Sequence, residues 1–184
     1  CSSLKSITLP STVNEIGDGA FCGCSNLREV TFNEGLQEIG DDAFHNCSSL
    51  ESMTLPSTVI EIGANAFRDC SLREVTFNNG LRNIGDGAFR DCTSLKNVTI
   101  PSTLVEIGKC AFGECGSLRE VELNGVPQNL KSNAFYNCDA LERFIFPTIS
   151  YCLENIIQTG HWEELEDQLN EVRGVVQWES GELF

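Results

Sequence analysis

The sequence predicts a solenoid of stacked, mainly β repeats, and two observations carry this prediction. First, one sequence motif repeats along the 184-residue chain, and each copy begins at a cysteine: Cys1, Cys24, Cys47, Cys70, Cys92, Cys115 and Cys138. The spacings between these cysteines are 23, 23, 23, 22, 23 and 23 residues. Second, each unit contains the alternation L-x-x-I-x-L, which is typical of a short strand with one buried face. One such unit cannot bury its apolar groups alone, whereas stacked units share a continuous core.

The apolar positions recur in columns that stacked units would share. The strand supplies three columns: Leu4, Leu27, Leu50, Leu72, Leu95, Leu118 and Leu141; Ile7, Val30, Met53, Val75, Val98, Val121 and Phe144; and Leu9, Phe32, Leu55, Phe77, Ile100, Leu123 and Phe146. A second segment adds Ile16, Ile39, Ile62, Ile84 and Ile107, and an Ala-Phe pair adds Phe21, Phe44, Phe67, Phe89, Phe112 and Phe135. In a stack with the strand spacing of about 4.8 Å, we expect the last column to form an aromatic spine.

Turn residues separate these segments. The Ile of the second segment is followed by a glycine, which we expect at a bend that a Cβ atom would obstruct: Gly17, Gly40, Gly63, Gly85 and Gly108. After the strand, units one, three and five carry Pro-Ser-Thr, and units two and four carry Asn-Glu-Gly or Asn-Asn-Gly. Both sequences suit turns, and their alternation indicates a 46-residue duplication unit. The residue missing after Cys70 should also lie in a turn.

The repeat C-x-x-L-x-x-I-x-L-P-x-x-L-x-x-I-G-x-x-A-F-x-x resembles the BspA-type, or treponemal-type, leucine-rich repeat. The resemblance implies a right-handed leucine-rich-repeat solenoid, mainly β with short helical turns, and with a parallel β-sheet on its concave face. It also implies a surface, adhesion or interaction protein without a shared catalytic site. We therefore expect residues 1–147 to form six full repeats of about 23 residues and a degenerate seventh that starts at Cys138.

The two ends differ from the repeat. Residues 148–184 predict a C-terminal capping region with an amphipathic α-helix near 160–173, where Trp162, Leu165, Leu169 and Val172 have helical spacing. A helix that binds a partner is the alternative interpretation of this segment. At the other end, Cys1 begins within the repeat pattern, so we expect further repeats or another chain to cover the N-terminal coil.

The charge indicates which partners to expect. With 12 basic and 27 acidic residues the net charge is −15, which argues against nucleic acid or an anionic membrane and favours a protein partner. Membrane insertion is not expected, because no apolar segment is long enough to span a bilayer.

The outward strand positions carry six basic and six acidic residues, so they form a mixed-charge strip on an acidic chain. We name ten of them as candidate partner-binding residues: Lys5, Arg28, Glu29, Glu51, Arg73, Glu74, Lys96, Arg119, Glu120 and Glu122. Alternating charges that keep the sheet soluble are the simpler explanation of the strip. The functional explanation is a protein-binding surface on the concave side, where solenoids commonly bind.

The cysteines and histidines predict neither catalysis nor a cofactor. In a stack, the Cβ atoms of the cysteine column would lie nearly 5 Å apart, whereas a disulfide needs about 3.8 Å. A linear column cannot surround a zinc ion tetrahedrally, so we predict no metal site. His45 varies between units and should be solvated. Buried reduced thiols favour an intracellular location, whereas the resemblance implies the cell surface or secretion.

Two functions therefore remain open. The first is a non-catalytic module that binds a partner protein through the concave sheet face. The second is a structural spacer or scaffold subunit in a surface protein or a multi-protein assembly. Enzymatic activity would require residues that this sequence does not contain.

Overall fold

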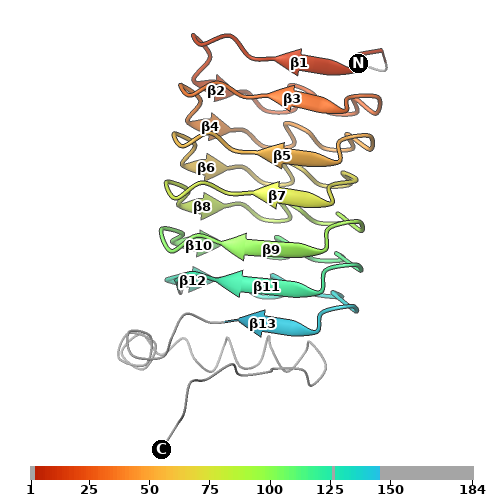
Figure 1. Cartoon of the computed structure of the whole chain (residues 1–184), viewed down its shortest axis with the longest axis vertical. Helices are drawn as coiled ribbons and strands as arrows, with labels where there is room; N and C mark the ends of the chain where they lie inside the picture. The colour runs from red at the N-terminus through yellow and green to blue at the C-terminus, as the bar shows by residue number, and fades with distance from the viewer. Residues whose placement is uncertain (1–2, 126, 146–184) are drawn as a thin grey trace, which may run out of the picture.

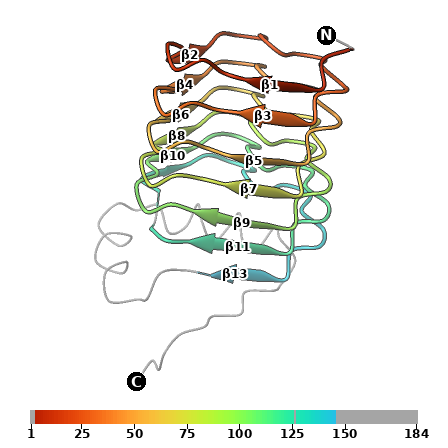
Figure 2. The ribbon, with the colours of Figure 1, turned by 45° about the horizontal axis from the view of Figure 1, so that its top comes forward.

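The computed structural model describes residues 3–125 and 127–145, which form a parallel β-solenoid of stacked coils (Figure 1). Each coil contributes one longer and one shorter strand, which lie on separate faces (Figure 2). The described residues contain thirteen strands and no helix. The predicted capping region at 148–184, with its helix near 160–173, lies outside the described residues.

The longer strands form what we call the long-strand face. They are β1 (Ser6–Thr8), β3 (Glu29–Thr31), β5 (Ser52–Thr54), β7 (Glu74–Thr76), β9 (Asn97–Ile100), β11 (Glu120–Leu123) and β13 (Arg143–Ile145). Paired strands are parallel and in register with the repeat: Ile7 lies opposite Val30, and Val121 lies opposite both Val98 and Phe144. These pairs confirm that the predicted strand residues lie in register within each group of paired strands.

The two-residue strands form a continuous six-stranded sheet. They are β2 (Glu15–Ile16), β4 (Glu38–Ile39), β6 (Glu61–Ile62), β8 (Asn83–Ile84), β10 (Glu106–Ile107) and β12 (Asn129–Leu130). Their Ile residues are buried while their first residues are exposed or half-buried. The second segment of the repeat is therefore a strand that closes the other side of each coil.

The long-strand face differs from the single sheet that the resemblance implies. It is divided into β1–β3, β5–β7 and β9–β11–β13, and no strand pairing joins β3 to β5 or β7 to β9. Figure 1 shows a wider step at both places than between β9 and β11. The divisions fall after units two and four, so they follow the 46-residue alternation of the sequence.

The Ala-Phe segments form turns and not the short helical turns that the resemblance implies. Two positions in each segment have positive φ, for example Asp42 at 54° and Asn46 at 59° in the second unit. A left-handed residue interrupts a right-handed helix, so the segment cannot continue as one. The backbone bonds to the next coil instead, as where the Phe44 N–H donates to the Ala66 carbonyl at 2.7 Å.

The Phe column forms the predicted aromatic spine. Phe21, Phe44, Phe67, Phe89, Phe112 and Phe135 stack with centroids 5.1–5.4 Å apart and interplanar angles of 4–13°. The rings from Phe44 to Phe112 are completely buried. The strand columns and the buried Leu and Ile residues surround them, so the core runs unbroken through the stack.

The glycines at the bend after the short strand in units two to five approach the preceding coil closely, whereas unit six has Lys131 at this position. A Cβ atom on Gly108 would lie 2.5 Å from the Asp86 amide nitrogen and from the Gly85 carbonyl carbon. On Gly17, in the first coil, it would meet nothing within 4 Å, so the predicted obstruction is wrong at that position. The column is therefore set by contact between neighbouring coils.

We expect Gly108→Ala to destabilise the solenoid by about 1–3 kcal/mol, because backbone atoms of the preceding coil would have to move. The matched control is Gly17→Ala, which should change the unfolding free energy by less than about 0.5 kcal/mol. Urea unfolding followed by circular dichroism measures both. Equal midpoints for the two variants would contradict the close approach at Gly108.

Candidate functional site

The ten candidate residues all lie on the long-strand face. Six of them come one position before a strand and form what we call the first row: Lys5, Arg28, Glu51, Arg73, Lys96 and Arg119. The other four lie within strands: Glu29 in β3, Glu74 in β7, and Glu120 and Glu122 in β11. Eight of the ten are exposed, whereas Glu120 and Glu122 are half-buried. The structure thus brings the predicted residues together as rungs of one surface.

Backbone hydrogen bonds hold the first row in place. The Arg28 N–H donates to the Lys5 carbonyl at 2.8 Å, and the Arg119 N–H donates to the Lys96 carbonyl at 2.7 Å. The Arg73 N–H donates to the Glu51 carbonyl at 2.7 Å in the same way. The backbone beneath each charged side chain is therefore fixed while the side chain extends into solvent.

Side-chain contacts divide the candidates into two groups. Arg73 Nη2 lies 3.5 Å from Glu51 Oε1, but both side chains are more than half exposed, so this ion pair contributes little. Glu120 is held more closely, with Oε2 2.9 Å from Nη1 of Arg143. Glu122 accepts a hydrogen bond from Thr99 Oγ1 at 3.2 Å. The two half-buried glutamates therefore have partners within the sheet.

A hollow of about 540 Å³ opens on the long-strand face at the division between β7 and β9. Its lining residues come from these two strands, from the residues that flank them and from the residue after β11: Arg73, Glu74, Val75, Thr76, Phe77, Asn79, Lys96, Asn97, Thr99, Pro101 and Asn124. Three of them are candidates from the sequence. Phe77, Asn79, Pro101 and Asn124 were missed, because the repeat pattern assigns them to the core or to turns. The sequence feature that could have indicated the hollow is the alternation of Phe with Leu or Ile in the third strand column.

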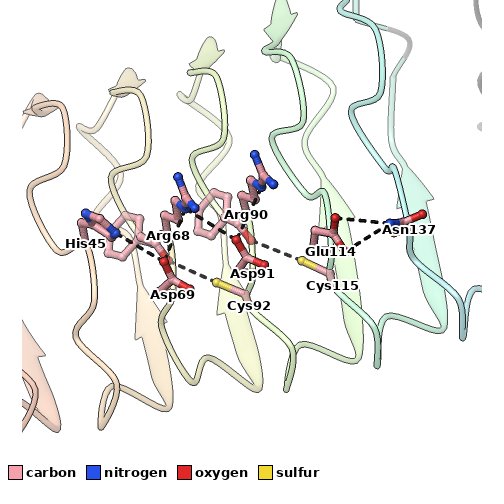
Figure 3. Close-up of polar contacts among 11 residues, drawn as sticks. His45, Arg68, Asp69, Arg90, Asp91, Cys92, Glu114, Cys115 and Asn137 are labelled. Atoms are coloured by element: carbon pink, nitrogen blue, oxygen red, sulfur yellow. Dashed lines mark hydrogen bonds and ion pairs between the residues drawn. The ribbon is translucent and has the colours of Figure 1, made fainter.

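A second row of polar side chains follows the Phe spine on another side of the coils (Figure 3). His45 Nε2 lies 3.3 Å from Asp69 Oδ2, Arg68 Nε lies 3.5 Å from Asp91 Oδ2, and Asn137 Nδ2 donates to Glu114 Oε1 at 3.2 Å. The His45 side chain is 32% exposed and also lies 3.5 Å from Asp42. It is therefore half-buried between two carboxylates and not fully solvated as expected.

The cysteine column makes hydrogen bonds along the stack. Each thiol from Cys47 to Cys138 donates to the backbone carbonyl of a Phe of the aromatic spine, at 3.1–3.2 Å. Cys47, for example, donates to Phe21, and Cys138 donates to Phe112. Burial raises the pKa of Cys92 and of Cys138 to about 12, and burial also raises the pKa of Cys115. Protonated, buried thiols are poor nucleophiles and poor metal ligands.

Other site chemistry is limited in the described residues. Between residues 3 and 145, leaving out 126, no group of three or more His, Cys, Asp or Glu side chains could hold a metal ion. Within the same residues there is no helix with the length and apolar character of a membrane span.

Comparison with known proteins shows relatives of the same architecture. The family model described as "BspA type Leucine rich repeat region" matches residues 1–71 and 60–159 with six copies. A leucine-rich repeat protein from Bacteroides ovatus is 36% identical with a TM-score of 0.72, and the match covers 80% of this chain and 38% of that one. The leucine-rich repeat protein of T. pallidum is 30% identical with a TM-score of 0.66, and the match covers 98% of this chain and 76% of that one.

The chain therefore spans well under half of the Bacteroides ovatus protein, but most of the T. pallidum protein. No curated protein matches it. The family match extends over most of the chain and agrees with the ladders seen in the coils. The chain belongs to the BspA-type leucine-rich repeat family.

Proposed function

We propose that the chain is a non-catalytic module that binds a partner protein through the long-strand face. The observation that supports this most is the distribution of positive charge. Of the 12 basic residues in a chain of net charge −15, six lie on this face: Lys5, Arg28, Arg73, Lys96, Arg119 and Arg143. Elsewhere acidic residues dominate, so a partner would meet a distinct mixed-charge surface here.

The long-strand face also has the physical properties of a binding surface. Eight of its ten candidate side chains are exposed, while interstrand hydrogen bonds hold the backbone beneath them. Little backbone entropy would be lost on binding, because the strands are already ordered. Arginine is enriched in the residues that contribute most to interfaces, and solenoids commonly bind along a continuous face.

The same features support a role without catalysis. The thiols of Cys92, Cys115 and Cys138 are buried and protonated, so they are not available as nucleophiles. His45 contacts two carboxylates on a different side of the coils from the hollow. Binding is therefore the activity that the exposed groups support best.

The test is charge reversal on the long-strand face. We expect Arg28→Glu/Arg73→Glu/Arg119→Glu to lose a partner that the unmodified chain captures from its native source, as measured by affinity capture with mass spectrometry. Each substitution replaces an attractive contact with a repulsive one, so the affinity should fall by more than about 100-fold. Circular dichroism would verify that the variant keeps its fold.

The matched control is Arg82→Glu/Lys109→Glu/Lys131→Glu, which makes the same change of net charge at exposed residues away from this face. It should keep the partner. Loss of the partner in both variants would indicate an effect of net charge alone. An unchanged partner list in the long-strand variant would overturn the proposal and favour the spacer or scaffold function.

A further inference from the structure

The divisions of the long-strand face coincide with one residue type. In the third strand column, Phe32 and Phe77 occupy units two and four, and the sheet is interrupted directly after each of them. Unit six has Leu123 at this position, and β11 pairs with the strands on both sides. The larger ring thus accompanies a break, and the smaller side chain accompanies a continuous sheet.

Proline is not sufficient to explain the breaks. Pro56 and Pro101 follow the strands after each break and lack an amide hydrogen. However, Pro147 occupies the same position in the seventh unit, and β13 in that unit pairs with β11. The Phe residue of the third column is a difference that separates units two and four from unit six.

The ring of Phe77 lies between two coils. It makes edge contacts with Phe89 of its own coil, at a centroid distance of 5.6 Å, and with Phe112 of the next coil, at 6.5 Å. It is partly buried and lines the hollow. A ring in this position acts as a wedge that keeps β7 and β9 apart.

The wedge leaves backbone groups of two strands without partners across the break. Among the described residues, no backbone hydrogen bond joins 73–77 to 96–100. β7 and β9 still approach within 8 Å between Cα atoms, less than the roughly 9.6 Å that an inserted strand would need, so the break forms a hollow over the strands and not a site for an added strand. The hollow has a volume of about 540 Å³, which lies within the range of about 300–1,000 Å³ typical of ligand sites.

The charges beside this break differ from those beside the first one. Arg73 and Lys96 flank the break between β7 and β9, whereas Arg28 and Glu51 flank the break between β3 and β5. The ion pair of Arg73 with Glu51 is exposed and weak. Arg73 and Lys96 can therefore both bind an anion of a partner. Glu74 is the single acidic residue in the lining of the hollow.

We propose that this hollow binds an extended, acidic segment of a partner protein. A carboxylate of the segment lies between Arg73 and Lys96, and an apolar side chain packs on Phe77 and Pro101. The inference rests on the proposed function and assigns it to one subsite. The rest of the long-strand face then adds contacts around this subsite.

The test uses a phage-displayed library of random heptapeptides, selected on the full chain and on Phe77→Leu. Leucine is the residue of the sixth unit, so we expect this variant to fold and to pair β7 with β9. Peptides selected on the unmodified chain should share an acidic residue next to an apolar one. A selected peptide made synthetically should bind Phe77→Leu at least about tenfold more weakly in fluorescence anisotropy.

Two further variants make the test specific. Phe32→Leu changes the other break and should bind the peptide unchanged, whereas Lys96→Gln should weaken it by about fivefold or more. Equal binding to the chain and to Phe77→Leu would overturn the subsite, as would selected peptides without acidic residues. If Phe77→Leu also keeps the partner that the triple arginine variant loses, the subsite fails while the proposed function stands.

Discussion

Raising the pH above about 10 is expected to lower the unfolding free energy by about 5 kcal/mol per pH unit. The cause is the buried cysteine column. Burial raises the pKa of Cys92 and of Cys138 from the ordinary value of 9.0 to about 12, and raises the pKa of Cys115 well above 9.0. The contact with Cys47, together with burial, also raises the pKa of Cys70. Each of these four thiols contributes about 1.4 kcal/mol per pH unit over the range in which it is ionised in the unfolded chain and protonated in the folded chain.

The sign follows from where the protons are bound. Above pH 9.0 the unfolded chain releases these thiol protons, whereas the folded chain keeps them until a pH of about 12. The folded state therefore binds more protons, and its stability falls as the pH rises. The stabilisation by protonated thiols is fully present below pH 9.0 and is lost progressively between 9.0 and about 12.

Urea unfolding between pH 8 and pH 11 in the presence of a phosphine reductant measures this slope. Cys115→Ala should reduce it by about a quarter, because one of the four thiols with a raised pKa is removed. Comparing the unmodified chain with Cys115→Ala separates thiol ionisation from the loss of lysine charge, because the two proteins have the same lysines. Stability that does not change up to pH 11, or an unchanged slope in Cys115→Ala, would contradict the buried thiol column.

The ladders could be predicted from the sequence because every coil must match its neighbours. A residue that recurs once per unit has to fit the same residue above and below it, as Phe44 fits Phe67 with centroids 5.1 Å apart. The segment after Cys70 can be one residue shorter than in the other units because it lies outside the strands and does not have to match its neighbours. Periodicity therefore shows which positions lie inside the stack and which face solvent.

The breaks in the long-strand face could not be predicted in the same way. They depend on the difference in volume between Phe77 and Leu123 at one column position, and a pattern that treats both as apolar does not distinguish them. The hollow follows from the break, so Asn79 and Asn124 were recognised only in the structure. The Ala-Phe segments form turns and not helix because residues such as Asp42 and Asn46 have positive φ. Asp and Asn adopt this conformation more readily than most residues, but the sequence alone does not show where they do so.

We expect Phe89→Ala to destabilise the solenoid by about 3–5 kcal/mol, the typical cost of removing a buried ring from a packed core. Phe89 is completely buried. It stacks on Phe67 at 5.4 Å and on Phe112 at 5.2 Å, and it lies nearly perpendicular to Phe77, at a centroid distance of 5.6 Å. Its removal would leave Phe67 and Phe112 each with one face unsupported and would remove the perpendicular contact of Phe77.

The position of Phe89 adds a second effect. Because β7 and β9 are not paired, the fourth and fifth coils are joined by the aromatic spine, the short-strand sheet and the backbone bonds of the turns. A repeat protein unfolds as a unit only while neighbouring coils are coupled strongly enough. Loss of the Phe89 ring should therefore separate the unfolding of the two halves, so that the urea transition broadens or divides in two.

Phe21→Ala is the matched control, because Phe21 is only partly buried and stacks on Phe44 alone in the described column, at 5.1 Å. It should cost less, about 1–3 kcal/mol, and leave a single transition, since only the first coil loses contact. Hydrogen exchange would locate the effect, with protection lost on both sides of Phe89 in one variant and only near the first coil in the other. A single sharp transition for Phe89→Ala, shifted no further than that of Phe21→Ala, would show that the short-strand sheet and the turn ladder couple the coils without the spine.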